Sequence, residues 1–195
     1  MKTKQQRFEE LISILKLAYV VDQPDLHTAV IRSPESSKSI TLEFIDGMIT
    51  VLTGDEVSQV LALDEEESVG VRVLDVENIL LQYEGSSREP IALSIYLYYT
   101  LLGMIWGLKA DPSIRNQDPT PGEYGYILLH ARKKDKTVNF EYTLHITGAI
   151  RLFNRLENKE FLLYPIDYVK DPEKQVLAFF EQFKDVDCIY AAGRQ

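Results

Sequence analysis

The chain has 195 residues, one cysteine and a formal net charge of −9 at pH 7. This length supports a substantial hydrophobic core, and one cysteine excludes an intramolecular disulfide, so we expect a cytoplasmic, reducing environment. The acidic balance argues against direct binding to nucleic acid, because contact with phosphates depends on clustered Lys and Arg. Basic proteins fit this charge better as partners.

An amphipathic helix is the first predicted element, over residues 4–17. Phe8, Leu11 and Leu15 recur at helical spacing, and Thr3 lies three residues before Gln6, as in a capping box. A short strand is predicted at 27–32, after a region that contains Pro24. This helix therefore has one apolar face that needs a sheet or another helix to cover it.

Residues 40–52 carry the clearest hairpin pattern in the chain. Asp46-Gly47 separates two runs of alternating apolar residues, which is typical of a two-residue turn. The turn pairs Ile45 with Met48 and places one set of side chains on a common face. We assign to the core the set Ile40, Leu42, Phe44, Ile49 and Val51.

The segment 55–67 is acidic and contains no Lys or Arg. Four consecutive like charges repel one another and favour exposure to solvent. The alternating acids and central glycine of a calcium loop are absent, so no metal site is predicted here. The functional interpretation is a binding surface for a basic protein partner, made of Asp64, Glu65, Glu66 and Glu67.

Alternating valines predict a strand at 69–76, followed by a short helix through Ile79, Leu80 and Tyr83. Residues 91–108 then carry no charge and form the central apolar helix. Such a length is close to the threshold of about 20 residues for a membrane span. We favour a core helix and expect no membrane association, because the strands predicted on both flanks would be separated by a bilayer.

Residues 111–122 include three prolines and form the longest predicted loop. This loop serves either as a lid or as a passive connection, and it allows a division into two subdomains within a single domain, 1–195.

A second hairpin is predicted over 124–146, with its turn at Lys134-Asp135. Its apolar face, which includes Leu129 and Phe140, should pack on the core, leaving the opposite face to solvent or a ligand. His130 and His145 would lie about 20 Å apart along the ladder, too far to bind one metal ion. A ligand site on this face would use Tyr124, Tyr126, His130, Glu141 and His145.

The remaining elements are a helix at 149–156, a strand at 160–169 and a final helix that Asp171 caps and Pro172 begins. The order of elements predicts an α+β fold with mainly antiparallel sheet, a central apolar helix at 91–108 and amphipathic helices at both ends.

Motifs for a nucleophile elbow, phosphate loop, dinucleotide site or zinc site are absent, so we predict no cofactor, no metal and no catalytic residue. Two hypotheses follow. The first is a noncatalytic protein-interaction module, similar in kind to an inhibitor, immunity factor or chaperone, with the acidic surface at 64–67 facing a basic protein. The alternative is a small-molecule-binding protein or an enzyme without recognisable motifs, with its site on the 124–146 hairpin.

Overall fold

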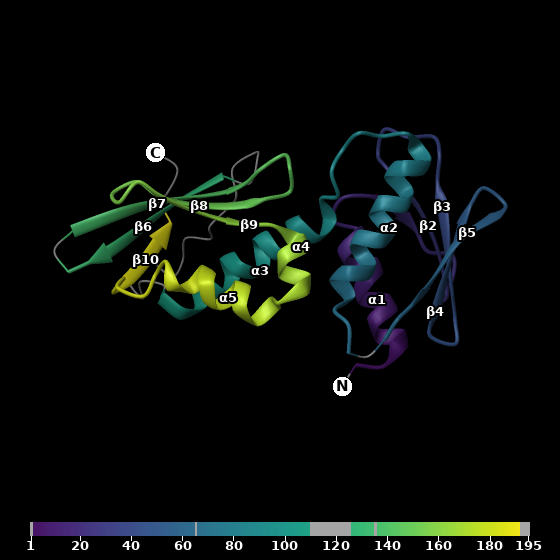
Figure 1. Cartoon of the computed structure of the whole chain (residues 1–195), viewed down its shortest axis with the longest axis horizontal. Helices are drawn as coiled ribbons and strands as arrows, with labels where there is room; N and C mark the ends of the chain where they lie inside the picture. The colour runs from purple at the N-terminus through teal and green to yellow at the C-terminus, as the bar shows by residue number, and fades with distance from the viewer. Residues whose placement is uncertain (1, 65, 110–125, 135, 192–195) are drawn as a thin grey trace. The chain divides into compact units, whose positions relative to one another are not determined.

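The computed structural model describes residues 2–64, 66–109, 126–134 and 136–191 (Figure 1). These residues form five α-helices and two five-stranded antiparallel sheets. The predicted α+β class with mainly antiparallel sheet is confirmed. The chain divides into two compact units, Met1–Tyr96 (unit 1) and Leu97–Gln195 (unit 2). The loop at 111–122 lies outside the described residues.

Unit 1 is a two-layer arrangement in which α1 and α2 cover one face of a sheet (Figure 1). The strands follow one another across the sheet in chain order, β1-β2-β3-β4-β5. The elements are α1 (Lys4–Leu15), β1 (Val20–Asp22), β2 (Thr28–Arg32), β3 (Ile40–Ile45), β4 (Met48–Thr53), β5 (Glu56–Ala62), α2 (Val69–Glu84) and the first residues of α3 (Ala92–Lys109).

The predicted first helix is confirmed, including its cap. Thr3 Oγ1 accepts from the Gln6 N–H at 3.2 Å, and Gln6 Oε1 accepts from the Thr3 N–H at 2.9 Å. The apolar stripe of α1 is buried against the sheet, where the ring of Phe8 stacks on that of Phe44 at 4.9 Å. The cap fixes where the helix begins, and the stripe fixes which side faces the core.

The hairpin of β3 and β4 has the predicted register, with Ile45 opposite Met48 and Phe44 opposite Ile49. Asp46 and Gly47 have φ angles of 53° and 84°. Two consecutive left-handed residues match the twist of the flanking strands, which explains why an Asp-Gly pair occupies this turn. All five residues assigned to the core face of this hairpin are buried.

The strand predicted at 69–76 is wrong, because this segment is the first half of α2. Val69, Val73 and Val76 are buried and recur at helical spacing, so the valines that alternate in sequence also line one face of a helix. Ser68 caps this helix by accepting from the Gly70 N–H at 3.2 Å. At the other end, Gly85 has a φ of 72° and forms a left-handed C-cap.

Unit 2 has a second sheet of order β10-β6-β7-β8-β9, with α3 and α5 on one face (Figure 1). Its core includes the stacked rings of Tyr98 and Tyr142, whose centroids are 4.5 Å apart, and the buried ring of Phe179. The elements after α3 are β6 (Tyr126–Lys133), β7 (Lys136–Leu144), β8 (Ile150–Asn154), β9 (Lys159–Leu163), α4 (Pro165–Lys170), α5 (Pro172–Glu181) and β10 (Cys188–Ala191).

Two predictions near the C-terminal end are corrected. The helix predicted at 149–156 is the strand β8, in which Ile150 and Leu152 alternate toward the core. The strand predicted at 160–169 ends at Leu163, and Pro165 begins α4 instead of lying in an edge strand. Proline suits the first turn of a helix because it has no N–H to leave unpaired. The edge strand β10 was not predicted.

The apolar stretch at 91–108 forms α3, as predicted. Its side chains include the buried residues Leu97, Leu101 and Ile105, whereas Tyr99 and Met104 are exposed. No helix among the described residues combines the length and apolar character needed to cross a membrane.

Candidate functional site

The acidic segment after β5 is the first candidate site. Asp64 and Glu66 are exposed, and no ion pair involves either residue within the described part of the chain. They line an open depression of about 750 Å³ together with Lys4 and Glu67. Glu65 lies outside the described residues. The exposed carboxylates of Asp64 and Glu66 are therefore the part of the predicted acidic surface that the structure leaves available for a partner.

Glu67 has a different role from its two neighbours. Its carboxylate forms an ion pair with Arg72, whose guanidinium also binds Asp75 at 2.7 Å and the Ala62 carbonyl at 2.6 Å. The Glu67 carbonyl accepts from Arg7. These contacts attach the segment to α1 and α2, so Glu67 holds the segment in place while Asp64 and Glu66 face solvent.

The outward face of the β6–β7 hairpin is the second candidate site. The predicted register is confirmed, with His130 opposite Asn139 and Glu141 opposite Leu128. His130 Nδ1 lies 2.6 Å from Asn139 Oδ1, and His145 Nδ1 lies 2.9 Å from Thr147 Oγ1. Each histidine is thus bound to a local side chain, and the described residues contain no group of three side chains suited to a metal ion.

Glu141 is enclosed by cations rather than open to a substrate. Arg151 lies 3.4 Å from Glu141 Oε2, and Arg155 contacts Glu141 Oε1. Arg151 also pairs with Glu160 and lies over the ring of Phe153 at 4.7 Å. Both carboxylate oxygens of Glu141 are therefore held by arginine side chains.

Two tyrosines complete the predicted set on this face. Tyr124 lies outside the described residues. The backbone of Tyr126 pairs with Thr143 in the ladder, but the position of its side chain is not described. The structure therefore brings together Glu141, two arginines and Phe153 on this face, and it does not bring His145 into the same cluster of contacts.

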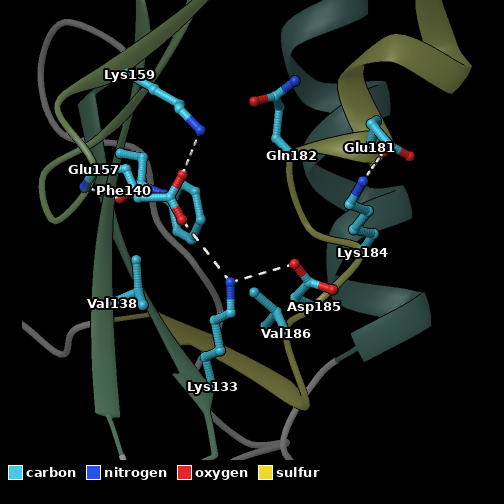
Figure 2. Close-up of a pocket in the computed structure, with 11 residues that line it drawn as sticks. Lys133, Val138, Phe140, Glu157, Lys159, Glu181, Gln182, Lys184, Asp185 and Val186 are labelled. Carbon is cyan, nitrogen blue, oxygen red and sulfur yellow. Dashed lines mark hydrogen bonds and ion pairs between the residues drawn. The ribbon is translucent and has the colours of Figure 1, made fainter.

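A pocket of about 420 Å³ opens at the end of the same hairpin, on the core side of the sheet (Figure 2). Its floor is apolar and includes Val138, Phe140 and Val186, and its rim alternates in charge. Lys133 Nζ lies 3.3 Å from Asp185 and 3.8 Å from Glu157. The rim residues are Lys133, Lys159 and Lys184 with Glu157, Glu181 and Asp185.

Every one of the six charged rim residues is in an ion pair with another member of the rim. Lys159 lies 2.9 Å from Glu157, which lowers the pKa of that exposed carboxyl through a hydrogen bond and the lysine charge. These pairs join the turn between β8 and β9 to the segment after α5. Asp187, two residues after Asp185, accepts from the Lys134 N–H at 2.8 Å.

A buried carboxylate in unit 1 was not singled out from the sequence. Glu77 on α2 has no exposed surface, and its Oε1 accepts from the Tyr19 hydroxyl at 2.9 Å and from the N–H groups of Ile91 and Ala92 at 2.9 and 2.8 Å. Burial raises the pKa of this carboxyl. Glu77 serves as the N-terminal cap of α3, supplied by another helix.

The strand β5 was also missed, although it adjoins the acidic segment. Its first five residues are all exposed. The sequence signal is hidden because Val57 and Val60 are three residues apart, which does not fit strict alternation.

Comparisons of the chain with models of protein families, with curated proteins and with solved structures find no match.

Proposed function

We propose that the chain is a noncatalytic cytoplasmic protein-interaction module, of the inhibitor, immunity or chaperone kind, that presents an acidic surface to a basic protein partner. The observation that carries this proposal is the exposure of Asp64 and Glu66 without an ion pair among the described residues. The net charge of −9 supports attraction of a basic partner and opposes direct binding to nucleic acid.

The surroundings of this surface add to the charge argument. From Ser39 to Val71 the sequence contains no Lys or Arg, and this span includes β3, β4 and β5. This span therefore contributes acidic and no basic side chains to unit 1, whereas Lys4 of α1 lines the same depression as Asp64 and Glu66. The acids in the span are Glu43, Asp46, Asp55, Glu56, Asp64, Glu65, Glu66 and Glu67.

The test is affinity capture from an extract of the native host with the intact protein and with an Asp64→Asn/Glu66→Gln variant. We expect a basic protein to be retained by the intact chain at about 50 mM salt and released at about 0.5 M, because screening weakens exposed charge pairs. The variant should retain at least about tenfold less of that protein, since both unpaired carboxylates are gone.

The matched control is Glu89→Gln/Glu173→Gln, which removes two exposed acids elsewhere on the chain. This control should retain the partner as the intact protein does. Both variants should keep the free energy of unfolding within about 0.5 kcal/mol, because exposed substitutions of this kind change few contacts. Equal retention by the Asp64→Asn/Glu66→Gln variant would contradict the proposal.

The alternative proposal is a small-molecule-binding protein or enzyme with its site at the 124–146 hairpin. The observation that favours it is the pocket over Phe140 and Val138, which has a volume typical of small-ligand sites. A small molecule that stays bound in native mass spectrometry, and is lost from a Val138→Trp variant that fills the pocket, would support this alternative. Retention of the molecule by that variant would contradict it.

A further inference from the structure

The edge strand β5 differs from the other sheet edges in length. It has seven residues, whereas the edge strands β1, β9 and β10 have three, five and four. Natural sheets protect their edges with short strands, with central lysines or with proline. Between Val57 and Ala62 there is no charged residue and no proline.

An irregularity in the ladder places both valines of β5 on one face. Val51 lies opposite Gln59, and Leu52 lies opposite Val57, so Ser58 is an extra residue in a β-bulge. Val60 lies opposite Thr50. Thr50 and Leu52 alternate with Val51, which is buried, so they lie on the outer face of the sheet. Residues opposite one another in the ladder share a face. Val57 and Val60 therefore point away from the helices.

These valines continue into an exposed apolar patch on the outer face of the sheet. Ile45 lies opposite Met48, and Met48 lies opposite Ala62 at the end of β5. Val57 and Val60 are 61% and 51% exposed, and Ile45 is 63% exposed. We define the β5 patch as Ile45, Met48, Leu52, Val57 and Val60.

Acidic residues lie at both ends of β5. Asp55 and Glu56 precede the exposed valines, and Asp64 and Glu66 follow the strand. All four are exposed. The strand itself spans about 24 Å at 3.4 Å per residue. A segment that adds to this edge therefore meets apolar side chains in its middle and negative charge at each end.

We infer that β5 and its patch bind an extended segment of the basic partner, which adds to the sheet as a sixth strand with apolar residues at its centre and Lys or Arg at both ends. The inference rests on the proposed function and specifies how the partner binds. Along β5, alternate N–H and C=O groups point away from β4, and strand addition pairs these groups. Basic residues at both ends suit either strand direction.

Charge also decides against a second copy of this chain as the occupant. If two β5 strands paired antiparallel about Gln59, Glu56 of one copy would face Ala62 of the other, and Asp55 would lie beside the segment that begins at Asp64. Each end of the paired strands would then bring acids together, which is destabilising. A partner segment with basic ends removes this repulsion.

The test uses synthetic peptides and the full chain. The first peptide is as long as β5 in alternating valine and threonine, with two lysines added at each end. The second replaces the lysines with glutamates. The third keeps the lysines and carries N-methyl groups on alternate central amides, in both possible phases, so that the side chains and charges remain but the backbone donors are blocked. Binding is followed by fluorescence anisotropy and by hydrogen exchange of residues 56–62.

We expect the lysine peptide to bind and to slow exchange in β5. The glutamate peptide and at least one N-methylated phase should bind at least about tenfold more weakly, because they lack the charge match or the backbone donors. A Val60→Lys variant should also bind the lysine peptide about tenfold more weakly, since a lysine in the middle of an edge strand protects that strand from pairing. The control Leu177→Lys, at a site 64% exposed on α5, should change binding less than about twofold.

Each contrary result has a distinct meaning. Equal binding by both N-methylated phases would overturn strand addition and leave the acidic-surface proposal standing. Equal binding by the glutamate peptide would overturn the basic partner itself. A dimer in sedimentation equilibrium that the Val60→Lys variant abolishes would identify a second copy as the occupant and overturn the inference. If Val60→Lys loses its native circular dichroism spectrum, Val57→Lys takes its place.

Discussion

The two units of the chain have the same arrangement of helices on a five-stranded sheet, and they differ at one equivalent edge of that sheet. In each, helices cover one face of a five-stranded antiparallel sheet whose four consecutive strands run β2–β5 or β6–β9. The fifth strand pairs with the first of these four. In unit 1 it is β1, which precedes them in the chain, and in unit 2 it is β10, which follows them. The strands β5 and β9 are therefore equivalent edges.

These two edges differ in their surface chemistry. The strand β9 begins with Lys159 and Glu160, and Glu160 pairs with Arg151 across the ladder. Pro165 begins a helix two residues after β9 ends. The strand β5 presents Val57 and Val60 instead. Unit 2 has the same sheet arrangement with this edge protected, so the arrangement does not require an apolar edge at β5. A binding role gives a reason for the apolar edge.

The cores of the two units also differ. In unit 2 the buried polar groups of the described residues include the phenols of Tyr98 and Tyr142, and the Tyr142 hydroxyl donates to the Tyr98 carbonyl at 2.8 Å. In unit 1 the Glu77 carboxylate is buried and accepts from three donors. A buried carboxylate is costly unless its hydrogen bonds are made, so unit 1 depends on one side chain more than unit 2 does.

The largest expected effect comes from Phe8→Ala in unit 1. Phe8 has no exposed surface and stacks on Phe44, so its removal should lower the free energy of unfolding by about 3–5 kcal/mol. Circular dichroism reports both units, whereas the fluorescence of Trp106 reports unit 2. We expect the dichroism transition to move to lower denaturant while the Trp106 transition moves less. An equal shift in both signals would favour one cooperative domain, as predicted from the sequence.

The next effect comes from Glu77→Ala, which leaves the Tyr19 hydroxyl and the N–H groups of Ile91 and Ala92 without their acceptor. We expect a loss of about 2–4 kcal/mol in denaturant unfolding. Glu77→Gln keeps one acceptor oxygen and should cost less. An equal cost for Gln and Ala would contradict this expectation, because Gln keeps both the volume of Glu and one acceptor oxygen.

The pH dependence of stability gives a second test of the role of Glu77. Burial raises the pKa of this carboxyl above its ordinary value of 4.5, so the folded state binds its proton more tightly than the unfolded state does. The stability contributed by this group is complete below pH 4.5 and is lost as pH rises through the folded pKa. As pH rises, the free energy of unfolding of the intact protein should therefore fall relative to that of Glu77→Gln.

The smallest effect comes from two glycines in different backbone environments. Gly85 ends α2 with a φ of 72°, and a Cβ there contacts nothing within 4 Å, so Gly85→Ala should cost about 1 kcal/mol from backbone strain alone. Gly103 lies inside α3 with the same open space. Gly103→Ala should stabilise by about 0.5–1 kcal/mol. Thermal unfolding of both variants checks the opposite signs, and a loss at Gly103 would contradict the reasoning.

Local patterns predicted the elements whose signals are complete within a few residues. The Thr3 and Gln6 cap, the Asp46-Gly47 turn and the Asp171-Pro172 helix start each fix both position and conformation. The valines of 69–76 fit both a strand and a helix, and the cap at Ser68 together with burial of Val73 and Val76 decides for the helix. In β8, Ile150 and Phe153 have helical spacing, but pairing with β7 and β9 prevails.

The candidate sites were predicted less completely, because a sequence does not show which charges meet. Glu141 was included in the predicted ligand site, yet two arginines from β8 and the segment after it bind its carboxylate. Glu67 was grouped with its acidic neighbours, yet Arg72 binds it. These pairs form between strands or between a loop and a helix, so their spacing in the chain carries no pattern.

The bulge at Ser58 has a consequence for variation in chain length. Removing this one residue would join the pairs Val51–Gln59 and Leu52–Val57 into a regular ladder without turning any other side chain to the opposite face. Removing one residue from the middle of β4 would reverse the faces of the strand on one side of the cut. Length differences between related chains are thus compatible with the fold at residue 58 and incompatible with it one strand away.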